Sequence, residues 1–241
     1  MSWCPGLYDD IGEKARDILY RGYARQPAVH FQYRCLDVNG DISFRVDDIL
    51  PGFGTVFRAI VPYTGKAELQ YLHDYFGITA GIGLTKNSFR GYNPILSFSG
   101  VIGTSLLSLG TDIAFNVLAR KFDRINAGLG FNTPFLVASL TINDKLDTLR
   151  ANLMANPLTN MAIAAEAAHR FSVNETSVTM GIQQAVLPFT FVKARVSTRG
   201  VFGALVQQGF WQKLYVTVSG EADFGAAKWG PKLGLSIAVR P

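Results

Sequence analysis

The stretch KLYVTVSGEADF, residues 213–224, decides the fold because polar or small side chains alternate with apolar ones along it. Its apolar set is Leu214, Val216, Val218, Ala222 and Phe224, and the positions between carry Lys213, Tyr215, Thr217, Ser219, Glu221 and Asp223. A period of two is that of a β-strand with one apolar and one polar face. The stretch predicts such a strand, and the question is which solvent each face meets.

The same alternation recurs after Pro27, in segments separated by turn residues such as Asn39-Gly40 and Asn143-Asp144. It is cleanest in the final segment, PKLGLSIAVRP, residues 231–241. No helical period interrupts these segments, so we expect an all-β, antiparallel sheet of about sixteen strands. We predict one domain over residues 1–241, with the strands in 28–241.

A single helix is predicted before the strands, over residues 6–21, with Gly22 at its end. Leu7, Ile11, Ala15, Ile18 and Leu19 fall on one face of it, and charged residues fall on the others. A helix this short is marginally stable alone in water, so it needs a surface to lie against.

Composition excludes several classes of protein. The 241 residues carry a net charge of +5 spread along the chain, with no basic tail of the kind that binds nucleic acid. The N-terminus is acidic and has no apolar core, so we do not expect a signal peptide. The sequence contains no run of about 18 apolar residues, so we expect no transmembrane helix. Cys4 and Cys35 form no CxxC, and His30, His73 and His169 have no metal-binding spacing. We therefore expect no enzyme activity, no catalytic or metal site and no cofactor.

Two folds fit the alternation. In a soluble sandwich the apolar faces form the core, whereas in a transmembrane β-barrel they meet lipid and the polar faces line a wet lumen. The barrel is favoured by apolar faces of medium-sized aliphatics and by polar faces rich in Gly, Ser, Thr and Asn. Aromatic residues also gather near strand ends, as in interfacial girdles, for example Tyr71, Tyr75, Phe76, Phe210, Trp211 and Tyr215.

Several segments resemble the eukaryotic mitochondrial porin family, the voltage-dependent anion channels, and its plant members in particular. They are PGLYDDIGEKARDILYRGY (5–23), KAELQYLHDYFGI (66–78), VKARVSTRG (192–200), TVSGEAD (217–223) and KLGLSIAV (232–239). The resemblance implies a barrel in the mitochondrial outer membrane that passes small anions and metabolites, including nucleotides in transit, with gating by voltage. Its expected partners are membrane lipid and these solutes, and a homo-oligomer remains an alternative to a monomer.

The chain departs from that family near its N-terminus. The family has nineteen strands, and here the segment 28–38 stands alone where the family has several strands. With sixteen strands the first and last would run antiparallel, with seventeen they would run parallel, and a partly open wall is a third alternative. Family helices usually carry lysine where this chain has Glu13, and this reversal argues against nucleotide contact at the helix.

The resemblance and the alternation together give candidate functional residues. The helix is expected to act as a gate or constriction through Leu7, Ile11, Lys14, Arg16, Ile18 and Arg21. The predicted pore-lining cations are Arg45, Arg58, Lys66, Arg150, Arg170, Lys193, Arg195, Lys213, Lys232 and Arg240. The acids Asp47, Glu68, Asp74, Asp112, Glu166, Glu221 and Asp223 face the same way and are fewer, which predicts a weak anion preference.

The final strand also fits the loose spacing by which the family's last strand is sorted to the outer membrane. Lys232, Gly234, Ile237 and Val239 are the residues of that expected signal. The alternative function is a poorly conducting porin paralogue that serves other outer-membrane proteins as a scaffold or subunit.

Overall fold

The computed structural model describes residues 4–23, 40–50, 53–61, 64–87, 91–210, 214–224 and 232–239, and only the backbone of 40–50, 53–61, 64, 85–87, 91–92 and 237–239. Two short helices and fifteen strands lie in these ranges. Neither described helix has the length and apolar composition needed to traverse a bilayer. The predicted strand at 28–38 lies outside the described residues.

The helices are the 3₁₀-helix η1 (Tyr8–Asp10) and the α-helix α1 (Glu13–Leu19). The strands are β1 (Gly40–Leu50), β2 (Phe53–Val61), β3 (Thr64–Leu72), β4 (Phe76–Asn87), β5 (Gly91–Gly103), β6 (Leu107–Asn116), β7 (Lys121–Asn132), β8 (Leu136–Asn143), β9 (Thr148–Leu158), β10 (Met161–Arg170), β11 (Glu175–Leu187), β12 (Thr190–Ser197), β13 (Val201–Phe210), β14 (Leu214–Asp223) and β15 (Lys232–Val239).

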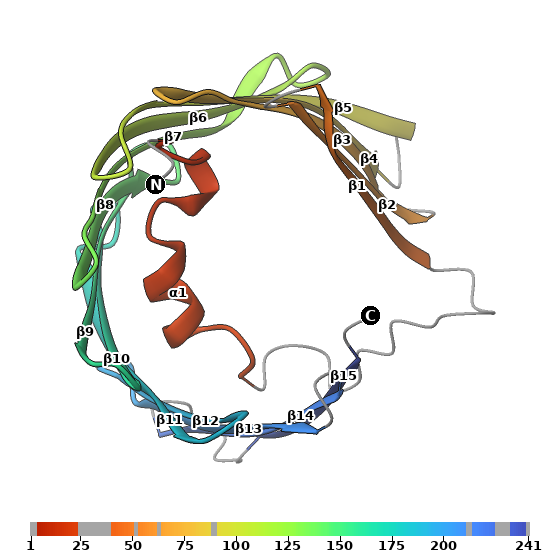
Figure 1. Ribbon diagram of the computed structural model, residues 1–241. Helices are drawn as coiled ribbons and strands as arrows, with labels where there is room; N and C mark the ends of the chain where they lie inside the picture. Colours follow the sequence, from red (N-terminus) through yellow and green to blue (C-terminus); the bar gives the residue numbers. More distant parts are fainter. Residues whose placement is uncertain are drawn as a thin grey trace. The chain divides into compact units, whose positions relative to one another are not determined.

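The chain divides into two compact units, each with its own helix and run of strands (Figure 1). In the first unit, which holds η1, β1 to β7 pair antiparallel in chain order. In the second unit, which holds α1, β10 to β15 do the same. Strands β8 and β9 are divided between the units. The prediction of an all-β, antiparallel fold preceded by an N-terminal helical segment is confirmed.

Each unit turns one sheet face toward its helix, and we call this face the helix face. In the second unit it carries Ala164, Thr179, Arg195, Leu205 and Glu221, all of them buried. In the first unit the helix face carries Asp112, Asn116 and Asn126, likewise buried. Charged and amide side chains therefore lie where a soluble sandwich would have its apolar core.

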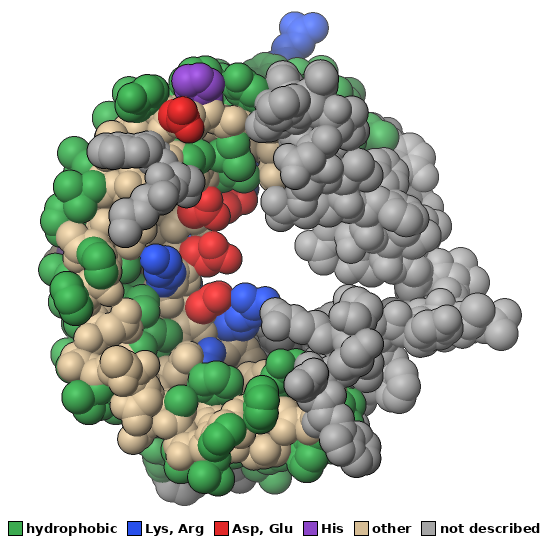
Figure 2. Space-filling view, in the orientation of Figure 1, with side chains coloured by type: hydrophobic (Ala, Val, Ile, Leu, Met, Phe, Trp, Pro, Cys, Tyr) green, Lys and Arg blue, Asp and Glu red, His purple; other side chains and the backbone are tan. Residues whose placement is uncertain are grey.

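The opposite face of each sheet is apolar and exposed. In the first unit it carries Ile82, Phe98, Ile102 and Leu109, and in the second Met180, Val196, Phe202, Val206, Val218 and Leu235. Figure 2 shows hydrophobic side chains on the side of the described strands away from the helices. A continuous apolar face of this extent is unfavourable in water, since each Å² of it costs about 25 cal/mol. The arrangement matches strands that face lipid on one side and a polar interior on the other.

Candidate functional site

The N-terminal segment, residues 4–23, carries the predicted gating residues. The structure corrects the single helix expected over 6–21, because the segment consists of η1 and the seven-residue α1 with a break at Gly12. Gly12 has φ of 74°, a left-handed conformation that favours glycine and interrupts the helix. The Leu7 N–H donates to Asp10 Oδ2 over 2.7 Å and closes the first turn of η1.

In the first unit, η1 lies against β5 and β6. Ile11 is buried, and the Tyr8 ring lies over Gly110. A Cβ added to Gly110 would lie 2.9 Å from a ring carbon of Tyr8, closer than side-chain carbons pack. The absence of a side chain at Gly110 therefore lets η1 approach the sheet closely.

In the second unit, α1 packs on β10, β11 and β12. Ala15, Ile18 and Leu19 form a buried cluster with Ala164 of β10. Strand β10 reads MAIAAEAAHR, and its alanines leave room for the helix. The predicted apolar stripe of the segment agrees with these contacts at Ile11, Ala15, Ile18 and Leu19, whereas Leu7 is half-buried.

The carboxyl-terminal end of α1 is held by polar contacts from the helix face of the second unit. The Tyr20 hydroxyl donates to Glu166 Oε1 of β10 over 2.6 Å. Lys193 Nζ of β12 donates to the Asp17 carbonyl oxygen over 3.0 Å. These groups reach a helix end whose last carbonyls have no partner within the helix.

Arg195 of β12 makes the most extensive of these contacts. One guanidinium nitrogen donates to the Leu19 carbonyl oxygen over 2.8 Å, and another lies 2.9 Å from Glu221 Oε2 of β14. The guanidinium carbon is 4.4 Å from the ring centroid of Tyr23 and 5.4 Å from that of Tyr20. A cation over an aromatic face is attracted by the ring quadrupole.

Burial raises the pKa of both tyrosine hydroxyls in this cluster. Desolvation, followed by the hydrogen bond and negative charge of Glu166, raises the pKa of Tyr20 to about 12. Desolvation likewise raises the pKa of Tyr23 to about 12, against the opposing charge of Arg195. Both hydroxyls are therefore neutral at physiological pH.

The remaining described candidates are exposed or half-buried. Lys14 and Arg21 of the segment are exposed, Arg16 is half-buried, and Arg21 pairs with Asp17 over 3.0 Å. Among the predicted pore cations, Lys66 pairs with Glu68 over 2.5 Å and Arg150 is half-buried near Tyr20, while Arg170 and Lys232 are exposed.

Other candidates are described by their backbone or not at all. The strand register sets Arg58 of β2 opposite Lys66 of β3, and Arg45 lies on β1 two positions from the partner of Arg58. Lys213 and Arg240 lie outside the described residues. The expected sorting residues Lys232, Gly234, Ile237 and Val239 all lie on β15, paired with β14.

The first unit has a polar cluster of its own on the helix face. Asp112 of β6 pairs through Oδ2 with Arg124 Nε of β7 over 2.8 Å, and Asn126 Nδ2 donates to the same carboxylate over 3.2 Å. Asp9 of η1 lies close enough to act on Asp112 electrostatically. Arg124 thus neutralises Asp112 locally, whereas Asp9 repels it.

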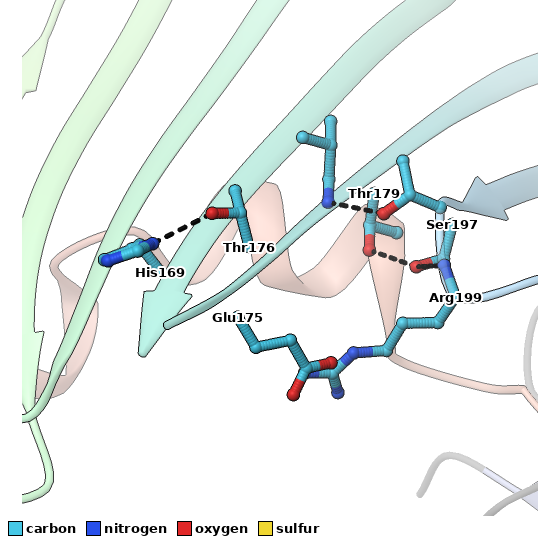
Figure 3. Close-up of polar contacts among 8 residues, drawn as sticks. His169, Glu175, Thr176, Thr179, Ser197 and Arg199 are labelled. Atoms are coloured by element: carbon cyan, nitrogen blue, oxygen red, sulfur yellow. Dashed lines mark hydrogen bonds and ion pairs between the residues drawn. The ribbon is translucent and has the colours of Figure 1, made fainter. Parts of the chain in front are cut away.

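The polar contacts at one end of β10, β11 and β12 are weaker than those around Arg195 (Figure 3). Glu175 and Arg199 pair over 3.1 Å, and both are about half exposed, so the pair contributes little to stability. On the face away from α1, His169 Nδ1 lies 2.8 Å from Thr176 Oγ1. In the described part of the chain, no group of three or more His, Cys, Asp or Glu could hold a metal ion.

Sequence reasoning placed Arg195, Glu166 and Glu221 on one face without predicting that they meet at the helix end. It also missed Tyr20 and Tyr23 as contact residues. One signal was available: Gly110, Gly181 and Gly203 occur on the face expected to be polar, and each lies under a side chain of the segment.

A sheet with an apolar exposed face, a charged buried face and a short amphipathic segment on the charged face defines a membrane porin. The model of the family described as eukaryotic porin matches residues 29–234. The mitochondrial outer membrane protein porin 1 of Arabidopsis thaliana is 38% identical, covering 98% of this chain and 99% of its own. The 36 kDa mitochondrial outer membrane porin of Solanum tuberosum shows the same identity and coverage.

The chain belongs to the eukaryotic porin family, and its location is the mitochondrial outer membrane. These alignments run over 278 positions, more than the 241 residues present here, so the relatives contain residues with no counterpart in this chain. Among solved structures, a mutant Rh. blastica porin matches with a TM-score of 0.50 at 8% identity, covering 83% of this chain and 95% of that one. That likeness supports the porin fold alone.

Proposed function

We propose that this porin is a voltage-gated, weakly anion-selective pore for small anions and metabolites. The observation that carries the proposal is the inverted burial of the strands, with charged groups on the helix face and lipid-compatible side chains on the other. A membrane wall of this kind encloses a polar path for solutes.

Weak anion preference follows from the charges available on that path. Arg170 and Lys232 are exposed, whereas Glu166 and Glu221 are buried by contacts at the helix end. An excess of solvent-exposed positive charge biases ion passage, and screening over about 8 Å at physiological salt keeps the bias small in a wide pore. Membrane lipid and small solutes are the partners of a porin, and nucleotide passage and homo-oligomers remain part of the proposal.

Voltage gating is assigned to the N-terminal segment. It carries Lys14, Arg16 and Arg21, together with Asp9, Asp10, Glu13 and Asp17. A charge that crosses the membrane field changes its energy by about 2.3 kcal/mol per 100 mV. Movement of even part of this segment along the field is therefore enough to shift the balance between open and closed states.

Deletion of residues 1–22 tests the gating assignment. The shortened protein should keep a stable conductance but lose its closure at high voltage of either sign, because the moving charges are gone. Single-channel recordings of the refolded protein in planar bilayers measure this. Unchanged closure would contradict the assignment.

The same recordings on the full chain test the pore itself. A tenfold KCl gradient across the bilayer should give a reversal potential of the sign expected for chloride preference, with a magnitude well below the ideal value. A correctly inserted protein that conducts no current would instead support the scaffold or subunit function.

A further inference from the structure

Arg195 and Glu221 link three elements of the second unit that are remote in sequence. Arg195 stands on β12 and Glu221 on β14, with β13 between them. The Arg195 guanidinium donates one hydrogen bond to the carbonyl oxygen of Leu19, the last residue of α1, and another to the carboxylate of Glu221. The fork geometry of arginine allows both contacts at once, which a lysine cannot reproduce.

Burial makes this pair different from the other ion pairs of the described residues. The Arg195 and Glu221 side chains are 8% and 4% exposed, whereas the pairs at Arg21, Lys66, Arg124 and Arg199 are all more open to solvent. A buried charge without its partner is strongly unfavourable. Arg195 can therefore stay buried only while Glu221 and the helix end both accept from it.

The Tyr23 ring completes the enclosure of Arg195. A Cβ added to Gly203 of β13 would lie 3.0 Å from a Tyr23 ring carbon and 3.1 Å from Arg195 Nε. Tyr23 itself is 2% exposed. Strand β13 therefore has no side chain at Gly203, where the ring and the guanidinium stack. The stack shields the ion pair from the solvent of the pore.

We propose that Arg195 and Glu221 form a lock that holds the carboxyl-terminal end of α1 on the sheet. Arg195 is then a positioning residue, and its charge is not one of those that attract anions from solution. The inference deepens the proposed function, on which it rests, by separating the cations that hold the segment from those that set selectivity. Arg170, exposed at the end of β10, is one of the cations that set selectivity.

Thiol labelling measures the lock directly. In full-length protein with Cys4→Ser and Cys35→Ser, Ile18→Cys introduces one thiol at a position that is 4% exposed beneath α1. The rate of its modification by a membrane-impermeant maleimide is followed in lipid nanodiscs. In Arg195→Gln and in the charge-balanced double variant Arg195→Gln/Glu221→Gln, the rate should rise about tenfold or more, as local opening becomes easier.

Arg170→Gln is the matched control, because it removes an equal charge from the same face without touching the segment. It should leave the labelling rate unchanged and reduce the chloride preference, whereas Arg195→Lys should restore only part of the protection. Equal labelling of the double variant and the parent would overturn the lock. Loss of protection in a protein that shows no anion preference would uphold the lock and contradict the proposed selectivity, so the two failures are distinguishable.

Discussion

At the scale of single residues, the end of α1 depends on two tyrosines whose hydroxyls differ in their hydrogen bonding. The Tyr20 hydroxyl has Glu166 as its acceptor, whereas the Tyr23 hydroxyl has no hydrogen-bond partner among the described residues. A buried hydroxyl without a partner is normally unfavourable. The stack of its ring on Arg195 offsets part of this cost.

The raised tyrosine pKa values make the docking of α1 sensitive to alkali. Each hydroxyl has a pKa of about 12 in the folded protein and about 10 when exposed, so the folded state favours the neutral form. The stabilisation is fully present below pH 10 and is lost as the pH rises through about 12. Absorbance at 295 nm should show that Tyr20→Phe and Tyr23→Phe each remove a tyrosinate that forms near pH 12. A difference that titrates near pH 10 would contradict this burial.

At the scale of elements, the two helices depend on glycines of the strands beneath them. Gly110 of β6 lies under Tyr8, and an added Cβ would also lie 2.8 Å from Val101 Cγ2. Neither the ring nor the backbone of the neighbouring strand can move away easily. The close approach of η1 is thus specified by a missing side chain rather than by an attractive pair.

Gly110→Ala should displace η1 and destabilise its contact by about 1–3 kcal/mol, the usual cost of overpacking. Proteolysis of the N-terminal segment in detergent, followed by mass spectrometry, measures its release. Gly100→Ala on β5 is the control, since the nearest atom to its added Cβ is 4.0 Å away. Equal protection of η1 in both variants would show that Gly110 has no such role.

The alternation of side chains was enough to predict strands, their antiparallel pairing and the face on which Arg195 and Glu221 lie, because these properties are local. The contacts among Arg195, Glu221 and Leu19 were not predictable, since register and helix position decide them. The break at Gly12 was missed for a different reason. The spacing of Leu7, Ile11, Ala15 and Ile18 continues smoothly past it, so the apolar period gave no sign of an interruption.

At the scale of the whole molecule, membership in the porin family fixes which solvent meets each face. Val218 of β14 is 53% exposed on the apolar face, and its neighbour Thr217 belongs to the helix face. In a membrane, the first position meets hydrocarbon and the second meets water or polar groups.

Val218→Arg should therefore destabilise the protein folded in lipid vesicles by about 2–4 kcal/mol, as for cations on the lipid face of barrels. Thr217→Arg should have a much smaller effect. Urea titrations followed by tryptophan fluorescence measure both. A larger loss for Thr217→Arg would mean that the faces are reversed.

The contacts at the end of α1 also impose an order on assembly. Tyr20 and Glu166 are 146 residues apart, and Arg195 and the Leu19 carbonyl are 176 apart. Such distant partners meet only after the intervening chain has been organised, because closing so long a loop costs entropy that few contacts offset early. The N-terminal segment precedes these strands in the chain, but it therefore finds its place only after β10 to β14 are paired.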